Sequence, residues 1–327
     1  MTSDPAPEYA GTPSAREVLA AAVGSLGGQE RPGQIQMAEA VTRALESGEH
    51  LLVQAGTGTG KSLAYLVPAM LHDDRVVIAT ATLALQHQLV ERDIPALLDA
   101  ADHALGEHPT YSVLKGRSNY ACLHRTREGV PDDHGALVEM PTGSVGAEVV
   151  DLRAWAEQQA TEHGPGDRDS APRHGERAWQ QISVSARECL GAAKCAYGVE
   201  CFAERARERA MASSIIVTNH SLLAIDAIDG VPMIPEYAAV IVDEAHELAA
   251  RVTQAATQEL SPLMVERAAR RARNFVDDDS PAADDLADAG DALRAAVDDT
   301  DPGRLERVGV ALGDALALVR DSARTCW

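Results

Sequence analysis

The sequence predicts an α/β domain built on a parallel sheet, with a long insertion between two of its strands. Four short apolar runs are predicted as buried strands, and they lie at Leu51 to Gln54, Val76 to Ala79, Ile215 to Val217 and Val240 to Val242. Polar or glycine-rich residues and then a helical pattern follow each run. This alternation is typical of parallel sheets, whose ligands bind at the carboxyl ends of the strands.

Composition and pattern divide the 327 residues into segments. Residues 1–16 are rich in Pro, Ser, Gly and Thr and are expected to form a disordered tail. The α/β domain is expected over 17–110 and 206–250, around an inserted domain at 111–205. Helical periodicity, interrupted by an acidic run, predicts a helical segment over 251–327.

The net charge of −21 argues against a nucleic-acid partner only if the charge is spread evenly. It is not, because residues 274–301 hold ten Asp and one Arg, whereas residues 111–215 hold thirteen Lys or Arg against fifteen Asp or Glu. The acidic run is expected to be a solvated face or loop. The overall charge therefore does not exclude binding to nucleic acid elsewhere in the chain.

No apolar run approaches the 18 residues of a membrane span, and the N-terminal residues lack the pattern of a signal peptide. The protein is therefore expected in the cytoplasm, without a membrane partner. Five cysteines in that reducing compartment favour metal binding or plain burial over structural disulfides.

A glycine-rich loop follows the first predicted strand and opens a helical pattern. Its glycines let backbone N–H groups close around phosphate oxygens, while Lys61 adds a positive charge and Ser62 a hydroxyl ligand for Mg²⁺. The N-terminus of the following helix adds a partial positive charge. The loop is therefore predicted to be a Walker A loop, with Ala in the place of the first glycine, formed by Ala55, Gly56, Thr57, Gly58, Thr59, Gly60, Lys61 and Ser62.

Two carboxylates, Asp243 and Glu244, follow the last predicted strand. Asp243 is placed to hold Mg²⁺, directly or through water, and Glu244 to orient or deprotonate an attacking water. Such a pair after a strand is by itself ordinary surface. In the same chain as a Walker A loop, it predicts hydrolysis of a nucleoside triphosphate.

Four cysteines lie in the insertion, with 66, 5 and 5 residues between Cys122, Cys189, Cys195 and Cys201. Four thiolates can hold a [4Fe–4S] cluster, which tolerates wide gaps in the sequence. Zinc sites more often contain two close cysteine pairs, which this chain lacks. The spacing alone leaves a cluster, zinc and simple buried thiols open, and Cys326 is expected to be an ordinary thiol.

The run Asp243-Glu244-Ala245-His246 is the DEAH box of superfamily 2 helicases, and residues 31–248 resemble the DinG/XPD family of helicases. In that family a cysteine insertion, entered here through Lys115-Gly116-Arg117-Ser118-Asn119-Tyr120-Ala121-Cys122, holds a [4Fe–4S] cluster. The resemblance implies a RecA-like first motor domain with that cluster on the four cysteines, followed by the beginning of a helical arch. It also implies a second motor domain, which is expected to be absent from this chain.

Further roles follow from the same resemblance. Gln34, in a run similar to the Q motif, would hydrogen-bond the adenine of ATP, and His246 would couple the nucleotide site to the nucleic-acid site. Residues 80–89 resemble motif Ia, which would contact the backbone of a single strand. A helix start capped by Thr80 or Thr82 is the other interpretation of that run.

The function implied is an ATP-dependent DNA helicase that uses Mg²⁺, moves 5′ to 3′ on single-stranded DNA, acts at duplex junctions and serves repair or replication. This polypeptide alone is expected to bind nucleotide weakly and not to unwind. One alternative is a sensor that binds DNA with nucleotide and cluster but does not unwind it. Another is a zinc protein with an incidental phosphate loop. The sequence identifies no protein partner.

The basic residues near the cysteines are expected either to line a path for a displaced strand or to lie on solvated helix faces. Tyr120, Tyr197 and Phe202 are expected either to stack on bases or to pack around the cysteines. The basic residues are Lys115, Arg117, Arg125, Arg127, Lys194, Arg205, Arg207 and Arg209.

Overall fold

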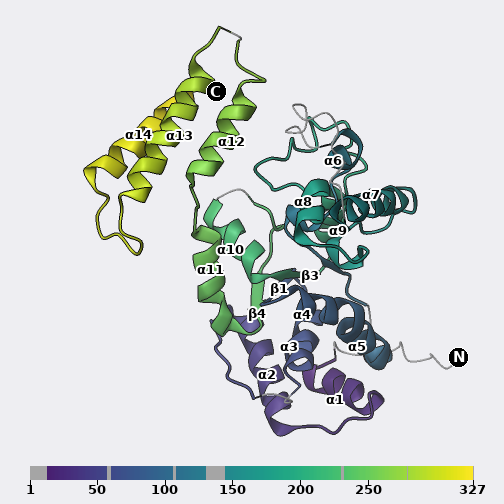
Figure 1. The fold of residues 1–327 in the computed structure, drawn as a ribbon. Coiled ribbons are helices and arrows are strands. Elements are labelled where there is room, and N and C mark those ends of the chain that lie inside the picture. Colours follow the sequence, from purple (N-terminus) through teal and green to yellow (C-terminus); the bar gives the residue numbers. More distant parts are fainter. Residues whose placement is uncertain are drawn as a thin grey trace, which may run out of the picture. The chain divides into compact units, whose positions relative to one another are not determined.

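The computed structural model describes most of the chain and divides it into two compact units, which end and begin at Ala256 and Thr257 (Figure 1). Each unit is considered by itself. The described residues are 13–56, 60–105, 108–129, 144–229, 232–277 and 279–326.

The first unit is built on a sheet of four parallel strands, in the order β2-β3-β1-β4. The strands are β1 (Val76–Thr80), β2 (Tyr111–Val113), β3 (Ile215–Asn219) and β4 (Ala239–Val242). Strand β1 is central and fully buried, and it pairs with β3 on one side and with β4 on the other. The predicted α/β class with a parallel sheet is confirmed.

Alternate residues of the central strands serve two hydrophobic cores. Val76 and Ile78 of β1 belong to one core, whereas Val77 belongs to the other. Strand β3 alternates in the same way, because successive side chains of a strand point to opposite faces. The strands are therefore buried on both faces, as expected for parallel sheets covered by helices.

The first core is closed by the N-terminal helices and the helices that follow β1. Tyr65, Leu66, Ile94 and Leu97 are among its fully buried large side chains. The helices are α1 (Ala15–Ser25), α2 (Pro32–Ser47), α3 (Lys61–Met70), α4 (Leu83–Gln88) and α5 (Ile94–Ala101), with a π-helical turn at Leu89–Asp93 between the last two.

The insertion is mainly helical and fills the second core. Trp179 and Phe202 are its largest buried side chains, and they join a cluster that includes Val77 and Ile216 of the sheet. The insertion contains α6 (Leu123–Glu128), α7 (Ser144–Thr161), α8 (Glu176–Ile182) and α9 (Phe202–Met211). The chain returns through β3, and α10 (His220–Asp229) and α11 (Leu248–Ala256) complete the unit.

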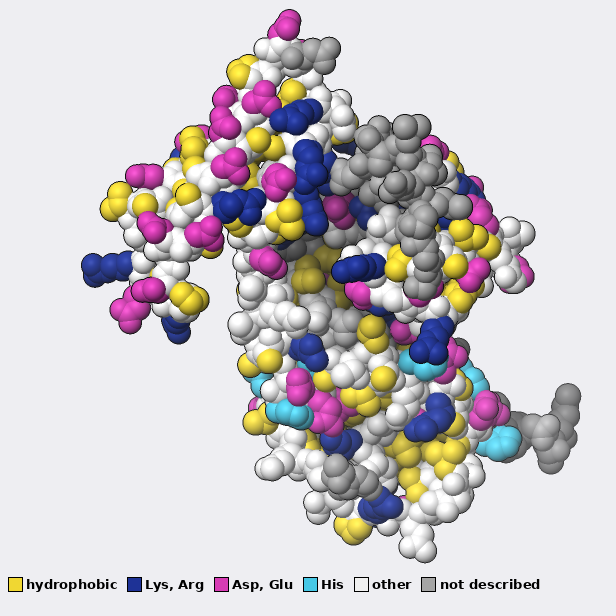
Figure 2. Space-filling view, in the orientation of Figure 1, with side chains coloured by type: hydrophobic (Ala, Val, Ile, Leu, Met, Phe, Trp, Pro, Cys, Tyr) yellow, Lys and Arg dark blue, Asp and Glu magenta, His cyan; other side chains and the backbone are white. Residues whose placement is uncertain are grey.

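The second unit is a bundle of α12 (Pro262–Ala272), α13 (Ala282–Asp298) and α14 (Val310–Thr325). Its small core includes Val265, Leu286 and Val319. The acidic run is confirmed as a solvated face, because the described Asp residues on α13 are exposed, and Figure 2 shows acidic side chains spread over this part of the chain. Cys326 packs against the core with its Sγ 3.2 Å from the carbonyl oxygen of Ala282.

The strand predicted at Leu51 to Gln54 is wrong. These residues form no strand, and Leu51, Leu52 and Val53 are 44%, 91% and 40% exposed. A strand is stabilised by a ladder of hydrogen bonds and by burial of its side chains, and this short run has neither in the described residues. Strand β4 accordingly pairs only with β1 there, and its Val240 is 42% exposed.

None of the helices in the described ranges is both long enough and apolar enough to span a membrane. The cytoplasmic location expected from the sequence stays a prediction.

Candidate nucleotide site and cysteine pocket

Gly60 joins the glycine-rich loop to α3, and its backbone conformation favours glycine. Its φ of +79° lies in the left-handed region, which other residues adopt at a cost. A Cβ atom there would also lie 2.2 Å from Nε2 of Gln34, whose amide donates to the Gly60 carbonyl oxygen at 3.1 Å. The buried Gln34 thus supports the phosphate loop, whereas its contact with adenine stays a prediction.

The rest of the loop is placed only in part. Its first residues, Ala55 and Gly56, have no regular secondary structure, while Thr57, Gly58 and Thr59 lie outside the described residues. Lys61 is the first residue of α3, so its side chain starts at the N-terminus of that helix. Backbone N–H groups without a helical partner and the positive end of the helix dipole favour an anion at this place.

Lys61 and Glu244 form an ion pair in which Nζ lies 2.6 Å from Oε1. The hydrogen bond to Glu244 raises the pKa of Lys61, and the same bond lowers the pKa of Glu244. Both side chains are about one-third exposed, at 28% and 33%, so the pair is open to solvent and to a competing ligand. Glu244 has a φ of +52°, an uncommon conformation for a residue with a side chain.

Asp243, which follows β4, is held at several points. Its N–H donates to the Ala79 carbonyl oxygen at 2.9 Å, and its own carbonyl oxygen accepts a bond from His220 Nε2, also at 2.9 Å. The Tyr65 hydroxyl donates to its Oδ2 at 3.2 Å, and the Glu244 N–H donates to its Oδ1 at 3.0 Å. The carboxylate is therefore fixed in direction at the end of the sheet.

Tyr65 was not recognised from the sequence as part of the site. Its hydroxyl lies on α3, where it also interacts with the Ser62 side chain three residues earlier, and burial is the main reason that its pKa is raised. Spacing of three residues on one helix places two side chains on the same face, so the helical pattern after Ser62 held the signal. Tyr65 thus connects Ser62 to Asp243.

His246 lies at the edge of this group and is 72% exposed. Its Nδ1 is 3.5 Å from Oε2 of Glu244, and its Nε2 is 3.9 Å from Oε1 of Glu247. The predicted coupling role of His246 is neither supported nor contradicted by these contacts.

The structure therefore brings Lys61, Ser62, Asp243 and Glu244 together, although Lys61 and Glu244 are 183 residues apart. A lysine at a helix N-terminus suits phosphate, and a hydroxyl beside an oriented carboxylate suits a hard divalent cation such as Mg²⁺. Glu244 adds a second carboxylate that is able to act as a base once Lys61 leaves it.

The four clustered cysteines line a single pocket, which also includes Arg117. Burial raises the pKa of the Cys122 thiol, and the nearby thiols of Cys189 and Cys201 raise it further. Within the described residues, no three His, Cys, Asp or Glu side chains are close enough together to form a metal site. The four sulfurs thus share one pocket but are not arranged as ligands in this structure.

The pocket has two sides, Cys122 on one and the Cys189–Cys201 segment on the other, and different contacts hold them in place. Cys122 directly precedes α6, and its N–H donates to the Ile182 carbonyl oxygen at 2.6 Å. Cys189, Cys195 and Cys201 lie on a segment of turns. That segment is tightly folded, because a Cβ atom on Gly198 would lie 2.3 Å from the Ala192 carbonyl oxygen.

The hypothesis of a basic path is wrong for Lys115, whose side chain is only 4% exposed. Several of the arginines are also engaged by the protein. Arg117 pairs with Glu204 at 2.6 Å, and Arg125 donates to the Ser183 carbonyl oxygen at 2.5 Å. Figure 2 shows the basic side chains on the visible face of the first unit interspersed with acidic ones.

The structure distinguishes between the two roles expected for the three aromatic residues, which were stacking on bases and packing around the cysteines. Tyr120 and Phe202 are buried in the second core, so they pack and are not available to bases. Tyr197 is partly exposed and lies under the guanidinium of Arg127, 4.8 Å from its ring centre.

The run at residues 80–89 starts a capped helix. The Thr82 hydroxyl accepts a bond from the Leu85 N–H at 3.2 Å, whereas Thr80 is fully buried. Gln86, also buried, donates to the carbonyl oxygens of Leu114 and Val217 and so connects α4 with β2 and β3. Contact between this run and a DNA strand stays a prediction.

The chain is similar in sequence to known helicases. The family model described as DEAD/DEAH box helicase matches residues 31–110. The ATP-dependent helicase DinG of Mycobacterium tuberculosis is 47% identical over 306 residues, which is 90% of this chain and 45% of that protein. The ATP-dependent DNA helicase YoaA of Escherichia coli is 37% identical over 239 residues, 72% of this chain and 36% of the relative.

This chain therefore spans less than half the length of these relatives. Among solved structures, a chain described as truncated XPD matches with a TM-score of 0.47 and 14% identity, covering 91% of this chain and 77% of that one.

Proposed function

We propose that the chain belongs to the DinG-like DEAD/DEAH box helicases and forms the ATP-binding lobe of an ATP-dependent DNA helicase. The observation that carries the proposal is the contact of Lys61 with Glu244, beside an oriented Asp243. A phosphate-binding lysine, a cation-binding carboxylate and a base are the parts that phosphoryl transfer to water requires.

We propose the following roles at this site. The loop from Ala55 to Gly60 and the side chain of Lys61 bind the phosphates of ATP, and Gln34 supports the loop while facing the adenine side. Ser62 and Asp243 hold Mg²⁺, which neutralises charge that develops on the phosphates. Lys61 exchanges its partner from Glu244 to the phosphates, and the released Glu244 orients or deprotonates the attacking water.

We also propose that the cysteine pocket holds a [4Fe–4S] cluster on Cys122, Cys189, Cys195 and Cys201. The fit rests on four thiols that line one pocket and on the absence of closely spaced cysteine pairs, which zinc sites usually contain. Metal binding requires thiolates, so uptake of iron would release the protons that the raised pKa of Cys122 retains. When bound, the cluster supplies a covalent connection between the two sides of the pocket.

For the whole protein we propose movement along single-stranded DNA from 5′ to 3′, unwinding at duplex junctions, and a role in repair or replication. His246 would couple the nucleotide site to the DNA-binding site. These proposals rest on the names of the relatives and on the motif residues.

ATP hydrolysis by the full-length protein, with and without single-stranded DNA, tests the proposal. We expect stimulation by DNA that is lost in Lys61→Ala, together with unwinding of a duplex that carries a 5′ overhang. The control is Arg43→Ala, a change of an exposed basic residue on α2 outside the proposed site. DNA binding that responds to nucleotide but never yields unwinding would instead indicate a sensor.

A further inference from the structure

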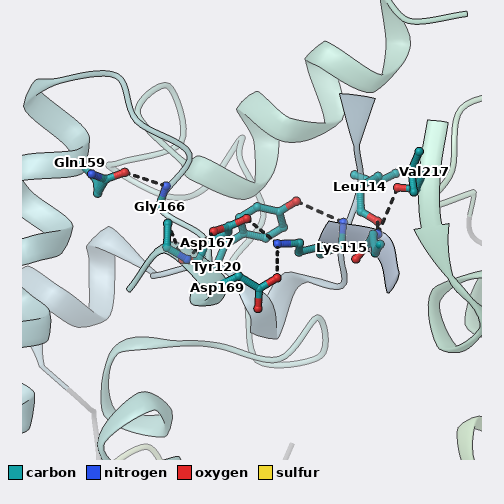
Figure 3. Close-up of polar contacts among 10 residues, drawn as sticks. Leu114, Lys115, Tyr120, Gln159, Gly166, Asp167, Asp169 and Val217 are labelled. Carbon is teal, nitrogen blue, oxygen red and sulfur yellow. Dashed lines mark hydrogen bonds and ion pairs between the residues drawn. The ribbon is translucent and has the colours of Figure 1, made fainter. Parts of the chain in front are cut away.

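Lys115 is an almost fully buried ammonium group held between two carboxylates (Figure 3). It follows β2 by two residues, at the point where the chain enters the insertion. Its Nζ lies 2.5 Å from Oδ2 of Asp167 and 2.8 Å from Oδ2 of Asp169. An ammonium group loses its hydration when buried, so it needs such partners to remain charged.

The same residue contacts the segment that leads to the first cysteine of the pocket. The Lys115 N–H donates to the Tyr120 hydroxyl oxygen at 3.1 Å, and Tyr120 forms an antiparallel bridge with Asp167. The next residue, Ala121, donates its N–H to the Gly166 carbonyl oxygen at 2.9 Å. Lys115 and Asp167 therefore hold this segment through side-chain and backbone bonds (Figure 3).

Cys122 comes directly after this segment and is held by the neighbouring ladder. Ala121 forms an antiparallel bridge with Ser183, and the Cys122 N–H donates to the Ile182 carbonyl oxygen. The position of Cys122 is thus set by backbone hydrogen bonds that involve none of the other clustered cysteines.

The opposite side of the pocket differs in this respect. The bonds of the Cys195 N–H to the Gly191 carbonyl oxygen and of the Gly198 N–H to the Cys195 carbonyl oxygen are local turns. Two apolar side chains of the same segment, Leu190 and Val199, are 52% and 96% exposed, whereas Tyr197 packs against the second core and Phe202, directly after Cys201, is fully buried. These contacts do not involve the buried Lys115–Asp167 pair, which holds only the segment that ends at Cys122.

We propose that Lys115, with Asp167 and Asp169, is a positioning residue that fixes Cys122 before metal binds, so that the cluster assembles against a pre-placed thiol. This inference rests on the proposed iron–sulfur site but concerns a property of the metal-free protein as well. Without the ammonium group, the buried Asp167 carboxylate would lose its partner and be repelled by the adjacent Asp169, and the segment that ends at Cys122 would lose its anchor.

Alkylation of the metal-free full-length protein, followed site by site by mass spectrometry, tests the proposal without relying on iron. In the unmodified protein, Cys122 should react several-fold more slowly than Cys189, Cys195 and Cys201. In Lys115→Met, which keeps much of the side-chain volume but removes the charge, Cys122 should react about as fast as the others. Lys194→Met, a change of an exposed lysine among the cysteines, should leave the pattern unaltered.

Iron and sulfide analysis after anaerobic reconstitution gives the second measurement. We expect a several-fold loss of both per polypeptide in Lys115→Met and no loss in Lys194→Met. If even the unmodified protein takes up no iron, the proposed cluster fails, while the alkylation pattern still decides the role of Lys115.

Nucleotide binding shows whether Lys115→Met remains folded. Should that variant not fold, Asp169→Asn, at a carboxylate that is 28% exposed, replaces it and should give a smaller acceleration of Cys122 alkylation. A folded variant that keeps both the slow reaction of Cys122 and the full iron content would overturn the proposal.

Discussion

Nζ of Lys61 lies 2.6 Å from Oε1 of Glu244, so the two groups with the most direct roles in the proposed chemistry neutralise each other. A lysine bonded to this carboxylate is not free for phosphate, and a carboxylate bonded to this lysine is a weak base, since the bond lowers its pKa. Binding of the ATP phosphates to Lys61 would break its bond to Glu244 and would thereby make Glu244 a stronger base. The ion pair therefore links nucleotide binding to activation of the base.

Replacement of Glu244 by Gln separates nucleotide binding from hydrolysis. Because the variant lacks the competing anion, we expect ATP to bind at least as tightly as in the unmodified protein. Turnover should fall by about a hundredfold or more, since the general base is lost. Equilibrium binding of a fluorescent ATP analogue and steady-state hydrolysis measure these effects, and weaker binding in Glu244→Gln would contradict the exchange of partners.

Replacement of Tyr65 by Phe should affect the divalent cation more than the nucleotide. The variant keeps the buried ring but removes the hydroxyl that donates to Asp243, so the carboxylate is less firmly oriented. The Mg²⁺ concentration for half-maximal ATP hydrolysis should rise several-fold, with metal-free nucleotide binding unchanged. The control is Tyr111→Phe, a change in β2 outside the proposed site. If both variants needed the same Mg²⁺ concentration for half-maximal hydrolysis, the role of Tyr65 would be contradicted.

Replacement of Gly60 by Ala should weaken nucleotide binding by about tenfold or more, because the left-handed conformation costs a residue with a Cβ atom about 1–2 kcal/mol. The new methyl group would also meet the Gln34 amide. Calorimetric titration of Gly60→Ala measures this loss, and full tolerance of the change would show that the loop adopts another conformation.

The stability contributed by Asp167 should depend on pH. Burial would raise the pKa of its carboxyl, but Lys115 outweighs burial and keeps that pKa below the ordinary value of about 3.9. The contribution is therefore fully present above about pH 4 and is lost as the pH falls through the lowered value. Asp167→Asn should reduce the free energy of unfolding by about 1.5–3 kcal/mol at pH 7, and by less at pH 3.

Denaturant unfolding of the metal-free protein at the two pH values measures this difference. Asp151→Asn, at an exposed aspartate of the insertion, should show little change at either pH. A loss for Asp167→Asn that grows on acidification would have the wrong sign.

The site residues were accessible to sequence reasoning where chemistry requires a fixed order of residue types. Lys61 and Glu244 are such residues, since phosphate binding demands a lysine after a glycine-rich loop at a helix N-terminus, and hydrolysis demands carboxylates after a strand. Tyr65 was missed because a tyrosine on an apolar helix face is also ordinary core. Lys115 was misjudged for a similar reason, since lysines are rarely buried and only the distant Asp167 and Asp169 make this one an exception.

The fold was predictable in part for comparable reasons. The first residues of strands β1 and β3, Val76 to Ala79 and Ile215 to Val217, are apolar and buried on both faces, so their runs were clear. Strand β2 has only three residues, Tyr111–Val113, and no apolar run, so its place in the sheet comes from pairing with β3. The run from Leu51 to Gln54 has the right composition but lacks a hydrogen-bonded partner in the described residues, which the sequence does not reveal.

A structure of the protein with Mg²⁺ and a non-hydrolysable ATP analogue tests the central claim most directly. We predict that Lys61 contacts the terminal phosphates and no longer Glu244, and that Mg²⁺ lies between Ser62 and Asp243. The freed Glu244 should face the terminal phosphate. A nucleotide bound elsewhere, with Lys61 and Glu244 still paired, would contradict the account.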